Sequence, residues 1–505
     1  MSYIPDLSHI DRAASQSVTS QIVAAFADAI ESGELNPGDK LAPTRELAEL
    51  AGVNHLTAAR AYRRLAEMGF VTGRVGSGTF VRTAAPAVSG RQRESDADLA
   101  WQLYLLPEDR PTYGDRVLAE MMRSAERGEG LPLSVGYPSP KLLPASEMQA
   151  LAAAAFEQEG PRAMQYENSQ GVPELREQLA ALMGRRGVDD DASGIVVTAG
   201  ARQGLTLATR AAIEPGDLVV CESPSFFGAI EALRATGAEM LSVPTDEQGL
   251  DTEAIERLLR RHEIHLVVIQ PRLHNPTGRD LSAERRAHLI ELARRHRFFV
   301  LEDGVYADLR IEGDPARPLR AEAPEHVIYV DSLSKTLGGG LRLGWVAASG
   351  PVLDRIAREK RRDDIDCVTL TQLMITRFLA AGSYEEHMGR AIPFHEERRD
   401  ALIDALKREL GAVASFPHPL GGGHIWVTLD EPVDERDLYE AAVREGVDFV
   451  PGGGMTPERP LATHMRLSFS YLEPEQLAEG VRRLRVALRR VRRAAQPRGA
   501  AMPLT

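Results

Sequence analysis

Short apolar runs alternate with helical stretches over most of this 505-residue chain, and the alternation limits the folds that it can adopt. The runs are rich in valine, isoleucine and leucine, and a helical pattern such as that of residues 282–297 separates one run from the next. Runs of this kind are strands buried on both faces of a sheet, which indicates a mainly parallel α/β arrangement. The predicted strands lie at residues 194–198, 217–221, 265–269, 298–301 and 326–330.

Length and composition indicate a globular protein of two or three domains. Hydrophobic residues make up 43% of the sequence and charged residues 26%, and the formal net charge is −13. No apolar run approaches the roughly 20 residues that cross a bilayer, and residues 1–20 lack an apolar signal core. The only cysteines, Cys221 and Cys367, offer neither a disulfide framework nor a set of metal ligands. We therefore expect a cytoplasmic protein without a membrane segment or a bound metal.

Composition changes at residues 84–98, where small residues, proline, glycine and charged residues replace large apolar ones. Such a composition is typical of a linker. We therefore expect an N-terminal domain at residues 1–83, a linker and lead-in segment at 84–130, and a large α/β domain at 131–490. The arginine-rich residues 491–505 are predicted to be a basic tail at the end of the last helix, with nonspecific DNA contact as the alternative.

The N-terminal domain shows the order helix, helix, helix and hairpin. Apolar positions at helical spacing predict a first helix over residues 17–32. Thr44 is placed to cap a short helix that ends at Leu50, and Asn54 is placed to cap a second one that runs to about residue 68. A strand, a glycine-rich turn and a second strand follow over residues 70–81. Two short helices joined by a turn and followed by a hairpin make a winged helix-turn-helix.

Charge in this region supports contact with DNA. Residues 40–82 hold seven lysines or arginines and three glutamates, a net charge of +4 in an acidic chain. A basic helix-turn-helix is suited to the phosphates of DNA. The alternatives are that the motif serves a protein contact and that Arg63 and Arg64 form a solvated helix face.

Lys335 is the residue of the large domain that most indicates a chemistry. The chain has only five lysines against 55 arginines, so a lysine kept here suggests a role that arginine cannot fill. An amine can lose its proton and form an imine with an aldehyde, whereas a guanidinium stays charged. The hydroxyls of Ser332 and Ser334 and the glycines that follow suit a phosphate. The motif therefore predicts lysine-bound pyridoxal phosphate (PLP).

Further polar residues follow the predicted strands, where parallel sheets bind their ligands. Asp303 comes after the strand 298–301 with one residue between them, and a carboxylate there can keep a pyridine nitrogen protonated. Tyr306 and Asn275 can reach the phenolic oxygen of the same ring. Taken singly, each of these has an ordinary explanation such as a loop cap or a turn. The other candidates are Gly200, Ala201 and Arg202 at a helix start, Arg342 after Lys335, and Phe226 beside the ring.

The N-terminal motifs at residues 43–48, 51–53, 61–65 and 76–81 resemble the GntR family of DNA-binding domains. The resemblance covers residues 17–82. It implies that Arg60 and Arg63 hold phosphates, which position a protein on DNA without specifying sequence. His55 departs from the arginine that is common at its position, so the base preference there stays open. The other DNA contacts that it implies are Arg45, Asn54, His55, Thr57, Ser77 and Gly78.

The large domain resembles the aminotransferases of fold type I from about residue 131 to residue 490. The resemblance implies that Lys335 forms the internal aldimine of PLP, that Asp303 pairs with the ring nitrogen, and that Asn275 and Tyr306 contact the phenolic oxygen. Phe226 is implied to stack on the ring. The implied phosphate contacts are Ser332, Ser334, Arg342 and the amides of Gly200, Ala201 and Arg202.

Two further residues match the family in ways that concern a partner and a ligand. Tyr166 corresponds to a tyrosine that reaches the phosphate of the neighbouring subunit, and Arg466 to the arginine that binds the α-carboxylate of a substrate. Gly339 departs from the proline that the family often has in the turn after the lysine, and this change removes no cofactor contact.

A GntR-like domain joined to an aminotransferase-like domain resembles the MocR subfamily of bacterial transcriptional regulators. The resemblance implies a homodimer, arranged head to tail, that binds double-stranded operator DNA. It also implies a sensor in which an amino compound, or PLP itself, occupies the site at Lys335 and shifts the population of two arrangements. Two alternatives stay open: a working aminotransferase, because Asp303, Lys335 and Arg466 are all retained, and a DNA-binding protein whose large domain is only a dimerisation scaffold.

Overall fold

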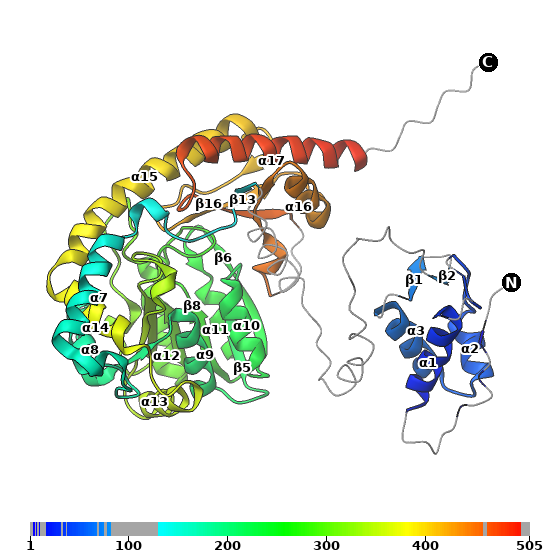
Figure 1. Ribbon diagram of the computed structural model, residues 1–505, viewed down its shortest axis with the longest axis horizontal. Helices are drawn as coiled ribbons and strands as arrows, with labels where there is room; N and C mark the ends of the chain where they lie inside the picture. The colour runs from blue at the N-terminus through cyan, green and yellow to red at the C-terminus, as the bar shows by residue number, and fades with distance from the viewer. Residues whose placement is uncertain are drawn as a thin grey trace. The chain divides into compact units, whose positions relative to one another are not determined.

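The structure, a computed structural model, describes residues 17–31, 34–36, 38–67, 70–74, 78–81, 130–457 and 462–495, together with residues 4, 5, 7 and 10. These residues form two compact units, one within residues 1–109 and the other within residues 110–505 (Figure 1). Most of the predicted linker, the end of the predicted tail and Ser77 lie outside the described residues.

The small unit has the predicted order of three helices and a hairpin. The elements are α1 (Val18–Glu31), α2 (Thr44–Leu50), α3 (His55–Glu67), β1 (Val71–Arg74) and β2 (Gly78–Val81), with β1 and β2 antiparallel. The inward positions of α3 are buried as the helical spacing predicts, and the ring of Tyr62 meets that of Phe26 edge to face at 5.5 Å. The Tyr62 hydroxyl donates to the carbonyl of Ala42 at 2.7 Å, which ties α3 to the start of α2.

One of the two predicted helix caps is wrong. Thr44 is the first residue of α2, and Pro43 occupies the cap position without a side-chain bond. The prediction for α3 is confirmed, because Oδ1 of Asn54 accepts from the backbone N–H of Thr57 at 2.8 Å. This cap fixes where α3 begins and therefore which side chains its first turn exposes.

The large unit is built on an eight-stranded sheet in the order β4-β11-β10-β9-β8-β5-β6-β7. The five predicted strands are present, and the contacts among β5, β6, β8, β9 and β10 are parallel. β11 is antiparallel to both β4 and β10, and β7 is antiparallel to β6. The strands are β4 (Ile195–Thr198), β5 (Leu218–Ser223), β6 (Glu239–Asp246), β7 (Gly249–Leu250), β8 (Ile264–Ile269), β9 (Phe299–Asp303), β10 (Val327–Ser332) and β11 (Gly344–Ala347).

Helices cover both faces of this sheet (Figure 1). Alternate residues of a strand point to opposite faces, so Val196 packs with α9, α10 and α13 while its neighbour Val197 packs with α8 and α14. The helices α11 and α12 pack on the same face of the sheet as α8 and α14, around Val267. The helices are α7 (Ala145–Glu159), α8 (Pro173–Arg185), α9 (Ala201–Ala212), α10 (Phe227–Ala235), α11 (Thr252–Leu259), α12 (Ala283–His296), α13 (Pro351–Asp363) and α14 (Thr369–Ala380).

A second, antiparallel sheet completes the large unit in the order β12-β13-β16-β15. Its strands are β12 (Ala414–Ser415), β13 (His424–Leu429), β15 (Val450–Pro451) and β16 (His464–Ser468), and the short β3 (Leu131–Pro132) pairs with β14 (Val447–Asp448). The helices α15 (Ser383–Leu410), α16 (Glu435–Arg444) and α17 (Pro474–Ala495) share its apolar core. Figure 1 shows α15 and α17 lying side by side above the strands.

None of the helices that the structure describes is both long and apolar enough to span a membrane. The same part of the chain contains no group of three or more His, Cys, Asp or Glu side chains that could hold a metal ion.

Candidate functional site

Ten of the predicted cofactor residues line one cavity of about 150 Å³ at the carboxyl ends of the parallel strands. Parallel sheets place ligands at this edge because polar loops from several strands converge there. Gly200, Tyr166 and Arg466 are predicted residues outside the lining. The predicted residues in the lining are Ala201, Arg202, Phe226, Asn275, Asp303, Tyr306, Ser332, Ser334, Lys335 and Arg342.

Lys335 follows β10, and the pKa of its amine lies below the ordinary value for lysine. Its Nζ donates to the carbonyl of Gly136 at 3.0 Å and lies 5.6 Å from the centre of the Tyr306 ring. Burial, and after it the positive charge of Arg466, lowers the pKa of Lys335 from 10.5 to about 8. A substantial fraction of this amine is therefore neutral near physiological pH, which is the form that attacks an aldehyde.

Asp303 is buried at the end of β9, so the prediction that it lies beyond the strand is wrong by a small margin. Its Oδ1 accepts from the backbone N–H of Val305 at 3.1 Å. Burial, opposed by the Val305 hydrogen bond and aided by the nearby Asp331, raises the pKa of Asp303 from 3.8 to about 7. A cation such as a protonated pyridine nitrogen would relieve the cost of this buried carboxylate, so the residue fits PLP.

One end of the cavity can hold an anion. Gly200 is the N-cap of α9 with φ 95°, and a Cβ there would lie 3.1 Å from Nη2 of Arg342. Arg342 follows the short helix at Gly339–Leu341 and lines the cavity with Ser332 and Ser334. A helix N-terminus, a guanidinium and two hydroxyls suit a phosphate. The Arg202 side chain is paired with Glu231, which leaves its backbone amide for this role.

Arg466, in β16, approaches the cavity from the second sheet. Nη2 donates to the carbonyl of Ser134 at 2.8 Å, and Nη1 donates to Oδ1 of Asn275 at 3.3 Å. Nε is buried and has no hydrogen-bond partner among the described residues. Burial lowers the pKa of Arg466 to about 10, so the group is still charged at neutral pH. A buried guanidinium with an unpaired donor suits a carboxylate ligand.

Tyr166 does not line the cavity. It is 76% exposed and follows the short helix at Gly160–Met164. Met164, Ile365 and Val368 are also exposed, and Ile365 has the left-handed φ of 68°. The two segments lie side by side. The backbone N–H of Glu167 donates to the carboxylate of Asp366, and the hydroxyl of Thr369 donates to the carbonyl of Gln165. We call Met164, Tyr166, Ile365 and Val368 the exposed apolar patch.

Several lining residues were not predicted. Gln270 directly follows β8, so the rule that polar residues at strand ends bind ligands would have found it. Its Nε2 is buried without a partner among the described residues. His424, which does not line the cavity, was missed too, and it contacts the lining residue Tyr306 from β13 of the other sheet. No local sequence pattern signals such a contact. The remaining unpredicted lining residues are Tyr137, Val305 and Gly339.

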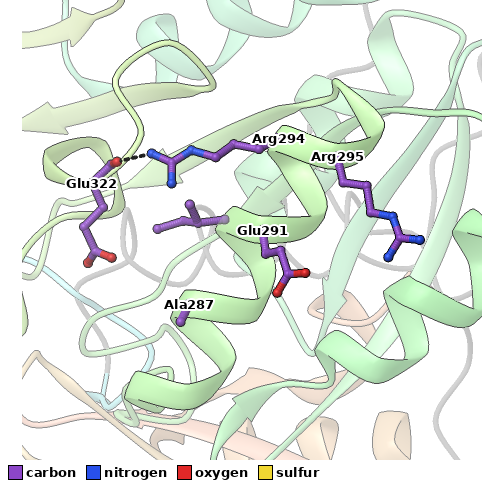
Figure 2. A pocket seen from close by; sticks show the side chains of 6 residues that line it. Ala287, Glu291, Arg294, Arg295 and Glu322 are labelled. Carbon is purple, nitrogen blue, oxygen red and sulfur yellow. Dashed lines mark hydrogen bonds between the residues drawn. The ribbon is translucent and has the colours of Figure 1, made fainter.

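A second hollow lies on the outer face of α12 and contains no predicted residue. Figure 2 shows Arg294 beside Glu322, whose carbonyl accepts from Nη2 of Arg294 at 2.6 Å, while Arg295 points away from that pair. The charged side chains drawn there are exposed, and Arg294 and Glu322 form ion pairs with Glu325 and Arg286, respectively, which lie outside the hollow. We therefore assign the ligand site to the cavity at Lys335.

In the small unit, the first turn of α3 presents His55 and Leu56 to solvent. The Thr57 hydroxyl donates to Oδ1 of Asn54 at 2.9 Å, so these two predicted contacts are tied to each other by the cap. Leu56 was not predicted, yet it is 69% exposed on the face opposite the core. Arg45, Arg60 and Arg63 are exposed, which a contact with DNA requires, and Gly78 begins β2.

A winged helix-turn-helix and a cavity built for PLP together define a class of transcriptional regulator that contains an aminotransferase fold. Residues 131–484 match the family model "Aminotransferase class I and II", and residues 18–81 match "Bacterial regulatory proteins, gntR family". The chain therefore belongs to the aminotransferase class I and II family and carries a GntR domain, which is the architecture of the MocR subfamily. Its cofactor is PLP.

Relatives match either the whole chain or the large unit alone. The Bacillus subtilis protein "Uncharacterized HTH-type transcriptional regulator YisV" is 28% identical over 474 residues, which are 93% of this chain and 96% of that protein. Aromatic-amino-acid aminotransferase 1 of Thermococcus litoralis is 31% identical over 374 residues, 73% of this chain and 90% of that enzyme. The crystal structure of the α-aminoadipate aminotransferase LysN from Thermus thermophilus, complexed with N-(5'-phosphopyridoxyl)-L-leucine, has a TM-score of 0.70 at 30% identity and covers 75% and 96% of the two chains.

Proposed function

We propose that this PLP-dependent regulator senses an amino compound, or PLP itself, in the cavity at Lys335 and changes its binding to operator DNA in response. The observation that carries the proposal is the meeting of Lys335, Asp303 and Arg466 in and beside one cavity of a chain that also holds a winged helix-turn-helix. Burial shifts the pKa of Lys335 downward and that of Asp303 upward, and Nε of Arg466 has no hydrogen-bond partner among the described residues.

The residues of the cavity would share the work of holding PLP. Lys335 would be the point of covalent attachment, Asp303 would pair with the ring nitrogen, and Asn275 and Tyr306 would contact the phenolic oxygen. When bound, PLP supplies an aldehyde carbon that reacts with primary amines. Arg466 would bind the carboxylate of an incoming amine. The proposed phosphate contacts are Ser332, Ser334, Arg342 and the amides at 200–202, with Phe226 on the ring face.

The exposed apolar patch supports a homodimer. Adjacent apolar side chains left in solvent are typical of an interaction surface, and a left-handed β-branched residue such as Ile365 is strained unless its surroundings hold it. A second copy on this patch would bring Tyr166 to the partner's phosphate site, with the two copies arranged head to tail. Val368→Asp should shift the protein toward monomer in sedimentation equilibrium and weaken PLP binding, while the matched change Val486→Asp on α17 should do neither.

The first turn of α3 would read bases in the major groove of DNA. We assign this role to Asn54, His55 and Thr57, with further DNA contacts from Arg45 on α2 and from Ser77 and Gly78 in the wing. The structure adds Leu56, whose exposed apolar side chain suits the methyl group of thymine. Arg60 and Arg63 lie on the same helix face one and two turns later and would hold phosphates. We further propose a cytoplasmic location, because the DNA that the protein binds lies there.

Absorption spectroscopy on the full-length protein with PLP tests the sensor. A near-visible band that Lys335→Ala abolishes supports covalent attachment, and its absence from the wild-type protein would leave the large unit as a scaffold. Primary amines that change this band should also change the affinity for operator DNA. Amines that alter the band while leaving DNA binding unchanged would contradict the sensor.

The second candidate function is catalysis. The retention of Asp303, Lys335 and Arg466 in one site favours it, because these are the groups that transamination uses. Multiple turnovers with an amino acid and a keto acid would support an aminotransferase that carries a DNA-binding domain. A single half-reaction without turnover would support the sensor.

A further inference from the structure

His424 lies next to Tyr306 although the two residues belong to different sheets. His424 begins β13, whereas Tyr306 follows β9. Nε2 of His424 and the hydroxyl oxygen of Tyr306 are 2.8 Å apart, and their rings meet edge to face with centroids 5.3 Å apart. Both side chains are only 3% exposed. The contact is a buried hydrogen bond that joins the two sheets at the wall of the cavity.

Gly136 makes room for this contact. A Cβ at this position would lie 2.7 Å from Cε1 of His424 and 3.8 Å from the hydroxyl oxygen of Tyr306. The carbonyl of the same glycine accepts from Nζ of Lys335. The His424 ring therefore packs against the same segment that accepts the hydrogen bond of Lys335.

The direction of the hydrogen bond depends on which nitrogen of His424 carries the proton. Burial, together with the charges of Arg466 and Lys335, holds the pKa of His424 well below its ordinary value, so the ring is neutral and has one N–H. Nδ1 is buried and has no hydrogen-bond partner among the described residues. A buried N–H without an acceptor is rarer in proteins than a buried acceptor without a donor. The proton therefore belongs on Nε2, where Tyr306 accepts it.

We infer that His424 is a positioning residue whose Nε2–H donates to Tyr306 and thereby turns the proton of the Tyr306 hydroxyl toward the cavity. The inference rests on the proposed function, because the group that would receive this proton is the phenolic oxygen of PLP. With the opposite tautomer, Tyr306 would donate to His424 and would have no proton for that oxygen. Asn275 would then be the remaining donor on that side of the ring.

The tautomer has a spectroscopic consequence. A hydrogen bond to the phenolic oxygen stabilises negative charge there and weakens the hold on the proton of the nitrogen that joins PLP to Lys335. Losing this bond should raise the pH midpoint at which the near-visible band changes. The other ionisable groups that face this nitrogen are Asp303, Tyr137 and Arg466, and the variants below leave all three in place.

The experiment compares full-length variants with bound PLP by titrating the near-visible band. Tyr306→Phe should raise the midpoint by about one unit, a tenfold change in proton affinity. His424→Phe keeps the ring packing but removes the donor, so it should raise the midpoint in the same direction by a smaller amount. His424→Gln should restore the wild-type midpoint, because its amide can donate. The double variant Tyr306→Phe, His424→Phe should match Tyr306→Phe alone.

His395→Phe is the matched control, since His395 is equally buried but lies against Phe394 and Phe469 and hydrogen-bonds to the carbonyl of Ala391 instead of to Tyr306. It should leave the midpoint unchanged. A wild-type midpoint in His424→Phe, or a shift that persists when Tyr306 is already Phe, would overturn the inference while the band itself upholds the proposed function. A wild-type protein that takes up no PLP would overturn both.

Discussion

The charge of Arg466 should set how readily Lys335 reacts with PLP. Burial comes first and Arg466 second among the causes that lower the pKa of Lys335 from 10.5 to about 8. At pH 7 an amine of pKa about 8 is roughly 9% neutral, whereas one of pKa about 10.5 is roughly 0.03% neutral, a difference of about 300-fold. Arg466→Met removes the second cause and leaves the first. The pKa of Lys335 should therefore rise to a value between these limits, and the reaction at neutral pH should slow severalfold.

The assay mixes full-length apo-protein with PLP and follows the growth of the near-visible band from about pH 6 to about pH 10. The rate should rise with pH and level off above the pKa of Lys335, with a higher midpoint in Arg466→Met. Arg398→Met is the matched control, because Arg398 is equally buried but pairs with Glu473 at 2.7 Å and is not among the charges that shift the pKa of Lys335. A wild-type midpoint near the ordinary value for lysine, or a midpoint that Arg466→Met leaves unchanged or lowers, would refute the reasoning.

Three further predictions concern stability and DNA. Burial raises the pKa of Asp303 from 3.8 to about 7, so its ionised form costs stability that accumulates as pH rises through that window. Asp303→Asn should therefore raise the unfolding free energy of the apo-protein at pH 8 by up to roughly 4 kcal/mol and by less at pH 5, and an equal gain at both would contradict this. Arg60→Ala should lower the slope of log affinity against log salt by about one, whereas an unchanged slope would remove its assignment to a phosphate. Replacing a contacted thymidine by deoxyuridine in a selected operator should weaken binding by the wild-type protein about fourfold. The same replacement should not change the affinity of Leu56→Ala, whereas the control variant Leu50→Ala should respond as the wild type does.

Local patterns predicted the elements well where one face or both faces of an element are uniformly buried. The apolar runs at β5 and β8 and the stripe on α3 are of this kind. Prediction failed for β11, because this short strand is inserted between β4 and β10 by long-range pairing that no local period announces. The cap at Thr44 was wrong by one position for a similar reason, since Pro43 and Thr44 both fit a helix start and only the backbone decides between them.

The sequence by itself determined the two folds, their order along the chain and the kind of chemistry at Lys335, because periodicity, turns and motif spacing are local properties. The tertiary structure decided which groups meet. Tyr306 and His424 are 118 positions apart and Asn275 and Arg466 are 191 apart, yet each pair is joined by a hydrogen bond across the two sheets. The low pKa of Lys335 also has this origin, because it depends on burial and on a charge that arrives from β16. Electrostatic interactions depend on distance in space and on exclusion of water, and only the packed sheets set both.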